Sequence, residues 1–263
     1  MPQGFHAAIF DVDGVLVDSP HEPAWREVFR ELMEGDWADI RDQTTWTPEA
    51  FTSEVYQQVL SGRPRMAGAL AALEHFGVPD PQVRAPVYAD RKQERVVELI
   101  VAGEFSAYPD ALRFLLAVKD AGLRVAAASS SKNAGLFLRR IRLDEFAERE
   151  GLAYAWIEPG LTLLDAFDVD ISGRQFERGK PHPEIFLTAA RELGVEPAAA
   201  FVVEDAVSGV QAAKAGAFAA LGVARHDDEA LLAQADADIV VATLDEIDLA
   251  AVAEGRLARP AAA

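Results

Sequence analysis

Short apolar runs that alternate with amphipathic stretches are the feature that most constrains the fold of this 263-residue chain. Five such runs, each bounded by polar residues or glycine, occur at 6–10, 123–128, 200–203, 218–223 and 237–241. Stretches with one apolar helical face lie at 109–121, 133–141, 184–194 and 207–215. Runs this short are typical of buried parallel strands, and the longer stretches are typical of crossover helices. The pattern predicts a doubly wound, Rossmann-like α/β sheet.

One long segment interrupts this alternation. Residues 20–107 are rich in Glu and Arg and show several helical patterns but no convincing strand. Helix stops are expected near Gly35, at 61–64 and at 77–81, which would divide the segment into a helical bundle. The expected domains are an α/β core of residues 1–19 and 108–263 and an inserted all-helical cap of residues 20–107.

Two parts of the expected core have weaker patterns. Residues 143–164 are expected to add turns between a helix and a strand within 166–172. The tail, 256–263, is expected to fray, as chain ends commonly do.

Composition and charge exclude several classes of partner. The net charge is -18 and cysteine is absent, so a nucleic-acid or anionic-membrane partner, a disulfide and a thiolate site are not expected. No apolar run approaches the ~18 residues of a membrane span, and the first residues show no secretion signal. We expect a soluble, cytoplasmic monomer.

Polar side chains follow three of the apolar runs, at the point where each run ends. Asp11 and Asp13 follow the first, "SSSKN" at 129–133 follows the second, and Glu204 and Asp205 follow the third. Each group alone is typical of a helix cap or a turn. Because the carboxyl ends of parallel strands meet at one edge of a sheet, all of them together predict a binding site at that edge.

The chemistry of these residue types favours phosphoryl transfer. Lys180, in "GKPHPEIF", adds a cation at the start of a further helix. Carboxylates and a phosphate are typical Mg²⁺ ligands, and Ser129 with Lys180 would neutralise the transferring group. A carboxylate can also act as nucleophile and form an aspartyl-phosphate. Strand alternation returns residues two apart to the same face, so Asp11 and Asp13 can address one cleft.

Four segments resemble, in order, the four motifs of the haloacid dehalogenase (HAD) superfamily: "DVDGVLVDS", "SSSKN", "GKPHPEIF" and "EDAVSGVQAAKAGA". The resemblance covers nearly the whole chain. It implies that Asp11 is the nucleophile, Asp13 the general acid and base, and Ser129 and Lys180 the residues that hold the phosphate. The Mg²⁺ ligands that it implies are Asp11, the Asp13 carbonyl, Glu204 and Asp205.

The inserted domain resembles the cap of the β-phosphoglucomutase branch, in "HEPAW", "GRPR" and "DRKQ". This resemblance implies that His21 couples to Asp13 and responds to closure, that Gly62 and Arg65 clamp the non-transferring phosphate, and that Lys92 reaches into the site. The substrate-binding residues implied are His21, Trp25, Gly62, Arg65, Lys92, Ser131, Lys132 and Asn133.

Three departures from that branch leave the sugar open. "RMAGAL" lacks the acid and the hydroxyl that follow the matching Arg, and "HEPAW" begins two residues closer to Asp13 than the matching motif does. The segment 143–164 is also extra.

The chain is therefore expected to be a Mg²⁺-dependent phosphomutase that acts on a small sugar phosphate. The most straightforward reaction is the conversion of β-glucose 1-phosphate to glucose 6-phosphate, with glucose 1,6-bisphosphate as activator and intermediate. The first alternative is a sugar-phosphate phosphatase that shares every core residue. A non-enzymatic phosphoacceptor module is the remote alternative. Such modules need only ~120 residues and have no use for an acid and base two residues after the acceptor.

Overall fold

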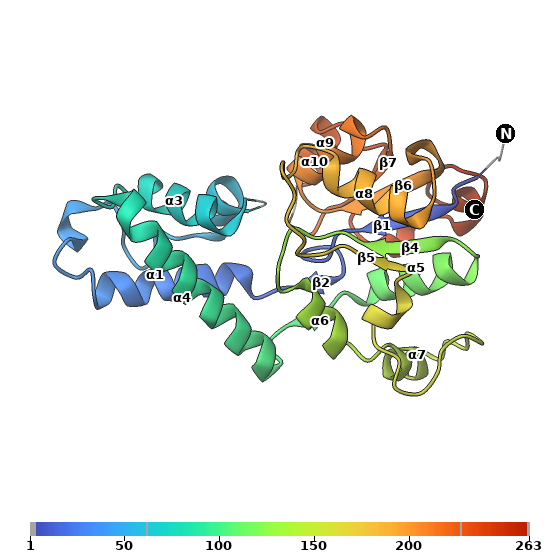
Figure 1. Ribbon diagram of the computed structural model, residues 1–263, viewed down its shortest axis with the longest axis horizontal. Coiled ribbons are helices and arrows are strands. Elements are labelled where there is room, and N and C mark those ends of the chain that lie inside the picture. The colour runs from blue at the N-terminus through green and yellow to red at the C-terminus, as the bar shows by residue number, and fades with distance from the viewer. Residues whose placement is uncertain (1–3, 62, 227, 262–263) are drawn as a thin grey trace. The chain divides into compact units, whose positions relative to one another are not determined.

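The computed structural model describes residues 4–61, 63–226 and 228–261, and it divides into two compact units (Figure 1). One unit contains the residues up to Asp18 and those from Ser106 onward, and the other is Ser19–Phe105. The chain leaves the first unit once and returns to it once. Each unit has a hydrophobic core of its own.

The first unit is built on a six-stranded parallel sheet, as predicted. Its strand order is β5 (Val169–Asp170), β4 (Arg124–Ala127), β1 (Ala7–Phe10), β6 (Ala200–Glu204), β7 (Ala219–Val223) and β8 (Ile239–Val241). Phe10 pairs with Ala127 of β4 and with Val203 of β6, so these three strands end at the same edge. The strand order reverses at β1, which is the kind of position where open α/β sheets form their ligand sites.

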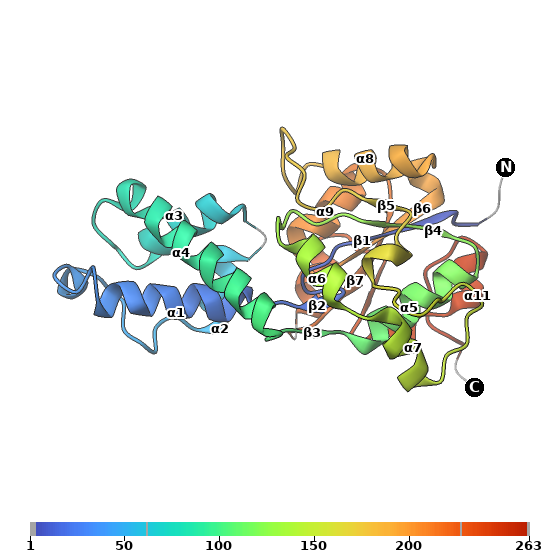
Figure 2. The ribbon, with the colours of Figure 1, turned by 60° about the horizontal axis from the view of Figure 1, so that its bottom comes forward.

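Helices cover both faces of this sheet (Figures 1 and 2). The helices on one face are α8 (Glu184–Leu193), α9 (Val207–Ala215) and α10 (Glu229–Gln234), and α5 (Pro109–Asp120) lies on the other. Ile9 belongs to the same core as Phe186 of α8. The next residue, Phe10, points to the opposite face, where Phe114 of α5 contacts both Phe10 and Phe201 with ring centroids 6.2 Å apart. The apolar strand β1 is therefore buried on both faces of the sheet.

The weakly patterned segment 143–164 contains a helix that was not predicted. After α6 (Ala134–Arg140), α7 (Leu143–Glu150) forms, and the following loop folds back so that the Leu143 N–H donates to the Leu161 carbonyl at 2.9 Å. The loop leads into the short helix η3 (Leu164–Ala166), just before β5. The predicted strand within 166–172 forms only its central pair of residues.

The prediction of a frayed tail is wrong for the described residues 256–261. They follow the short helices η5 (Leu244–Glu246) and α11 (Leu249–Ala253). Arg259 donates to the Glu246 carboxylate and to the Val240 carbonyl, both at 2.8 Å, and the Asp248 N–H donates to the Ala258 carbonyl at 2.9 Å. The tail is ordered because it satisfies backbone groups at the edge strand β8.

Every regular element in the described residues of the second unit is a helix. Its elements are α1 (His21–Glu34), η1 (Arg41–Gln43), α2 (Ser53–Val55), η2 (Tyr56–Leu60), α3 (Arg65–His75) and α4 (Pro81–Ala102). Phe29 lies at the centre of its core, with ring centroids 5.1 to 6.0 Å from those of Trp46, Phe51, Phe76 and Tyr88. These aromatic contacts let a unit this small bury a core of its own.

A short antiparallel pair of strands stands where the chain passes between the units. In this pair β2 (Val17–Asp18) binds β3 (Ser106–Ala107), and the Tyr108 N–H donates to the Leu16 carbonyl at 3.0 Å.

Across the described part of the chain, no helix has both the length and the apolar composition that crossing a membrane requires.

Candidate active site

The turn after β1 places Asp11 and Asp13 at the carboxyl edge of the sheet. Asp11 is buried, and its N–H donates to the Val203 carbonyl at 3.0 Å, which ties it to β6. Gly14 follows with a φ of +79°, and its N–H donates to the Val17 carbonyl at 2.8 Å. Glycine suits this left-handed position because other residues pay a steric cost there. The chain therefore turns sharply directly after the second acid.

Lys180, in the loop before α8, lies between two of the predicted acids. Its ammonium donates to the Asp11 carboxylate at 2.5 Å and also to the Glu204 carboxylate. Its side chain is only 8% exposed, and the ammonium lies 4.9 Å from the centre of the Phe186 ring. The ammonium is thus fixed beside Asp11, where it can also meet an anion bound at this edge.

Glu204 and Asp205 occupy the end of β6, where two glycines make room for them. Glu204 is 1% exposed, and its carboxylate accepts hydrogen bonds from the Asp205 and Ala206 N–H groups, both at 3.1 Å. A methyl group on Gly209 of α9 would overlap the Glu204 carboxylate, and one on Gly14 would overlap the Asp205 carboxylate. Because Gly14 and Gly209 have no side chain, the two carboxylates have the space that they occupy.

The segment after β4 brings Ser129 to Asp13. The Ser129 hydroxyl donates to the Asp13 carboxylate at 3.1 Å and accepts the Ser131 N–H at 3.0 Å. The Ser131 hydroxyl in turn accepts the N–H of the buried Asn133 at 3.2 Å, whereas the Lys132 side chain is exposed. The structure therefore joins Ser129 to the acids and leaves Lys132 facing solvent.

The charges at this edge do not balance. Burial raises the pKa of Asp11 from 3.8 to about 7; the Lys180 ammonium opposes that rise, while the Glu204 and Asp13 carboxylates add to it. Burial, together with Glu204 and Asp11, raises the pKa of Asp205 well above its ordinary value. Burial alone would lower the pKa of Lys180, but Asp11 and Glu204 outweigh it and hold that pKa above 10.5. One ammonium does not neutralise the group of carboxylates.

This imbalance fits a divalent cation, because added positive charge would relieve the repulsion among the acids. Carboxylate oxygens are also the ligands that Mg²⁺ prefers. In the described residues no three acidic or histidine side chains close around one point as a complete metal cage. Mg²⁺ usually keeps water and phosphate among its ligands, so an incomplete set of protein ligands suits it.

Three of the predicted cap residues, His21, Trp25 and Lys92, form a cluster within the second unit. The Lys92 ammonium lies 3.3 Å from His21 Nδ1 and 4.7 Å from the centre of the Trp25 ring. Lys92 is only 5% exposed, an unusual environment for a lysine. Arg65, at the start of α3, contacts Asp90 at 3.8 Å and is more than a third exposed. Gly62 lies outside the described residues.

Sequence reasoning missed Arg225 and Asp110, which form a buried ion pair at 3.0 Å beside the Gly14 turn. Arg225 comes two residues after β7 ends. A polar residue thus follows the fourth apolar run, 218–223, as it does the first three, and this pattern could have identified Arg225. Asp110 had no such signal, because it lies in the first turn of α5.

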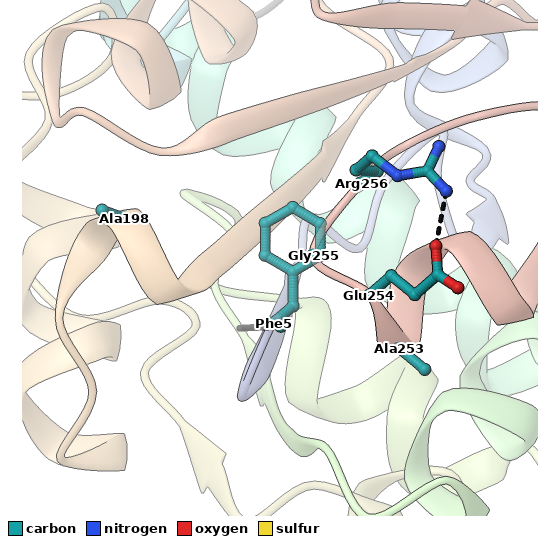
Figure 3. Close-up of a pocket in the computed structure, with 7 residues that line it drawn as sticks. Phe5, Ala198, Ala253, Glu254, Gly255 and Arg256 are labelled. Atoms are coloured by element: carbon teal, nitrogen blue, oxygen red, sulfur yellow. Dashed lines mark hydrogen bonds and ion pairs between the residues drawn. The ribbon is translucent and has the colours of Figure 1, made fainter. Parts of the chain in front are cut away.

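A separate hollow of about 630 Å³ lies away from these residues (Figure 3). Phe5 and Ala198, which line it, precede β1 and β6, and Gly255 and Arg256 complete it from the tail. It is therefore at the amino ends of the strands, whereas the acidic residues follow the carboxyl ends. Its one ion pair, between Glu254 and Arg256, is exposed and internal to the lining.

Comparisons with known proteins find relatives and solved structures that match over most of the chain. A family model for haloacid dehalogenase-like hydrolases matches residues 5–216. The chain is 33% identical to a β-phosphoglucomutase of Mycobacterium bovis, over 94% of this chain and 93% of that protein. It is 30% identical to a phosphorylated carbohydrates phosphatase of Thermotoga maritima, over 86% and 89%. The crystal structure of an archaeal β-phosphoglucomutase from Pyrococcus sp. strain ST 04 aligns with a TM-score of 0.68 and 29% identity, over 94% and 96% of the two chains.

Proposed function

Because this chain belongs to the haloacid dehalogenase-like hydrolase family, we propose that Asp11 accepts a phosphoryl group from a sugar phosphate. Relatives named as a phosphoglucomutase and as a carbohydrate phosphatase identify the chain as an enzyme of one of these two kinds. The observation that carries the proposal is the buried contact of Asp11 with Lys180, next to Glu204 and to the Ser129–Asp13 pair. A buried carboxylate beside a fixed cation and a second carboxyl group at one edge of the sheet supports the proposed roles of nucleophile, phosphate holder and acid.

Each residue has a distinct part in the proposed reaction. An Asp11 carboxylate oxygen attacks phosphorus, and the bond from phosphorus to the sugar oxygen breaks. Asp13 gives a proton to that leaving oxygen and later takes one from the attacking hydroxyl, a role worth ~10²- to 10⁴-fold in rate. The Lys180 ammonium and the Ser129 hydroxyl hold the non-bridging oxygens, where charge accumulates.

The Mg²⁺ ligands that we propose are Asp11, the Asp13 carbonyl, Glu204 and Asp205. When bound, Mg²⁺ would neutralise phosphate charge and so ease attack by an anion. Glu204 already accepts three hydrogen bonds, from Lys180 and from two N–H groups, and so also positions the ammonium. Asp205, whose pKa is raised by burial and by the Glu204 and Asp11 carboxylates, would gain more from an added cation and is the better ligand of the two.

We assign recognition of the sugar and of a second phosphate to the cap. The buried Lys92, held against His21 and Trp25, offers an ammonium whose position is fixed by packing. Arg65 offers a guanidinium that can bind phosphate through two parallel hydrogen bonds. Its exposed ion pair with Asp90 is of a kind worth only ~0–1 kcal/mol, so exchanging it for a phosphate costs little. Gly62 of the cap, together with Ser131, Lys132 and Asn133 of the α/β core, completes the proposed set.

The proposed reaction is that of a β-phosphoglucomutase. The phosphoryl group on Asp11, first supplied by glucose 1,6-bisphosphate, passes to the 6-hydroxyl of β-glucose 1-phosphate. The bisphosphate so formed returns its 1-phosphoryl group to Asp11 and leaves as glucose 6-phosphate. Support comes from a relative of that name that is 33% identical over nearly the full length of both chains. The second candidate is a phosphatase in which water attacks the aspartyl-phosphate. The phosphatase relative from Thermotoga maritima supports it, and both candidates use the same core residues.

One assay separates the two candidates. The protein is incubated with β-glucose 1-phosphate, Mg²⁺ and a trace of glucose 1,6-bisphosphate, and glucose 6-phosphate and free phosphate are measured together. Isomer without free phosphate supports the mutase, and free phosphate alone supports the phosphatase. If neither product forms, and Asp11→Asn behaves as the unaltered protein does, the proposed function is wrong.

A further inference from the structure

Arg225 is a buried cation that the proposed reaction leaves unexplained. Its side chain is only 8% exposed, although it carries a permanent charge. The guanidinium donates from Nε to the Gly14 carbonyl at 3.3 Å and from Nη2 to the Val15 carbonyl at 3.2 Å. These two carbonyls directly follow Asp13 in the chain, so Arg225 grips the turn that carries the second acid.

The guanidinium is itself held from two other directions. Its Nη1 donates to the Asp110 carboxylate at 3.0 Å, and its flat face lies 3.9 Å from the centre of the Tyr108 ring. Asp110 also accepts the Thr243 hydroxyl at 3.1 Å and the Leu244 N–H at 2.8 Å. A guanidinium fixed by a hydrogen-bonded carboxylate and an aromatic face has little freedom to move.

The two hydrogen bonds from Arg225, to the Gly14 and Val15 carbonyls, set the orientation of two consecutive peptide groups. The turn needs such support because Gly14 has a φ of +79° and, as glycine, loses more conformational freedom on ordering than any other residue. If the turn shifts, the Asp13 carboxyl shifts with it, away from the Ser129 hydroxyl that it contacts at 3.1 Å. A displacement of about 1 Å in a catalytic group can cost ~10²-fold in rate.

We propose that Arg225 is a positioning residue, which holds the Gly14–Val15 turn so that Asp13 presents its carboxyl group to the leaving oxygen. This inference rests on the proposed function, because it takes Asp13 to be the general acid. The competing interpretation is that the Arg225–Asp110 pair only stabilises the fold.

The two interpretations differ in how much the rate of phosphoryl transfer to Asp11 falls with each leaving group when Arg225 is replaced. Acetyl phosphate releases acetate, which leaves without a proton, whereas glucose 6-phosphate releases an alkoxide that needs one. A misplaced Asp13 therefore slows transfer from the sugar phosphate and spares transfer from acetyl phosphate. A loss of folded protein lowers both rates by the same factor, so it cancels from their ratio.

The experiment measures phosphorylation of Asp11 by each donor, with rapid quenching and intact-protein mass spectrometry, in Arg225→Lys. Lysine keeps the charge that Asp110 requires but cannot fork to two carbonyls. We expect the rate from glucose 6-phosphate to fall by roughly 10- to 100-fold and the rate from acetyl phosphate by less than about threefold. Arg225→Gln, which keeps hydrogen-bond donors without the charge, is the second variant if the lysine variant does not fold.

Arg113→Lys is the matched control. Arg113 lies on α5 in the same unit and also donates from Nε and Nη2, to the Asp245 carboxylate at 3.0 and 2.6 Å; its third hydrogen bond goes to Glu150 and none of the three reaches the turn. We expect both of its rates to stay within about twofold of the unaltered protein, as for most surface substitutions.

Asp13→Asn separates a failure of this inference from a failure of the proposed function. Suppose that Asp13→Asn lowers the rate of Asp11 phosphorylation by glucose 6-phosphate alone, and that Arg225→Lys lowers the rates with both donors equally. The positioning role is then overturned and the proposed function stands. If Asp13→Asn itself shows no selectivity between the donors, the role of Asp13 is wrong and the inference falls with it.

Discussion

At the scale of single residues, the two acids on either side of Val12 have different surroundings. Asp11 contacts an ammonium, and its pKa is raised by burial and by neighbouring carboxylates. Asp13 accepts the Ser129 hydroxyl and precedes the turn that Arg225 holds. A nucleophile needs a cation close by, and a proton donor needs a carboxyl group held in place, so the two environments suit two roles.

Replacing Asp13 by Asn tests this division. The amide cannot donate and accept a proton as a carboxyl group does, so we expect kcat for the sugar phosphate to fall by at least ~10²-fold. Because the main-chain carbonyl is retained, the Mg²⁺ concentration that gives half-maximal Asp11 phosphorylation by acetyl phosphate should stay within about threefold. Asp144→Asn, an acid on α7 paired with Arg142, is the control. A variant at Asp13 that keeps most of its turnover would contradict the assignment.

At the scale of secondary structure, the junctions between strands and helices shape the site. The first turn of α9 packs against Glu204 closely enough that residue 209 has no space for a side chain. Glu204 is thereby held against Lys180 and against the N–H groups of the next two residues. A glycine in a helix normally lowers stability, so its presence here reflects the space that the site requires.

Gly209→Ala and Gly135→Ala therefore form a matched pair with opposite expectations. Both glycines lie in helices, but a methyl group at Gly135 of α6 meets nothing within 4 Å. We expect Gly135→Ala to raise the free energy of unfolding by about 0.4–1 kcal/mol and to leave turnover unchanged. Gly209→Ala should lower the free energy of unfolding by ~1–3 kcal/mol and reduce turnover at least tenfold, because Glu204 must move. Urea unfolding and steady-state assays measure both, and equal behaviour of the two variants would refute the close packing.

At the scale of the whole molecule, buried acids oppose folding where they are ionised. The net charge of -18 already adds repulsion, and the group around Asp11 concentrates part of it. Between the ordinary pKa of 3.8 and about 7, the folded protein binds more protons at Asp11 than the unfolded chain does. The contribution of Asp11 to the free energy of unfolding therefore falls as pH rises through this window.

Chelating divalent cations should reveal this dependence. We expect the unfolding midpoint of the unaltered protein in excess chelator to fall, relative to that of Asp11→Asn, as pH rises from about 4 to about 7. Added Mg²⁺ should raise the midpoint more at about pH 7.5 than at about pH 5, because protons compete with the ion for the carboxylates. Midpoints are measured by thermal melts across this range. Parallel pH profiles of the two proteins, or a larger effect of Mg²⁺ at the lower pH, would count against a cation site at Asp11.

Much of the fold could be predicted because its elements have local signals. The apolar runs at 6–10, 200–203 and 218–223 form β1, β6 and β7, and the amphipathic stretch at 109–121 forms α5. The tail could not be predicted, because its order depends on Arg259 reaching Val240 and Glu246, partners that no local pattern identifies. The helix α7 was missed for a similar reason, since its start is stabilised by a loop that returns from Leu161.

By itself, the sequence determined which polar groups reach the candidate site, because parallel strands all end at one edge and Asp11, Ser129 and Glu204 follow such strands. Only the tertiary structure decided how these groups are paired. It places β1 between β4 and β6, so that Lys180 bridges Asp11 and Glu204, and it brings Arg225 to Asp110 across 115 positions of the chain. The physical reason is that hydrophobic periodicity reports burial within one element, whereas contacts between distant elements depend on the order in which strands assemble.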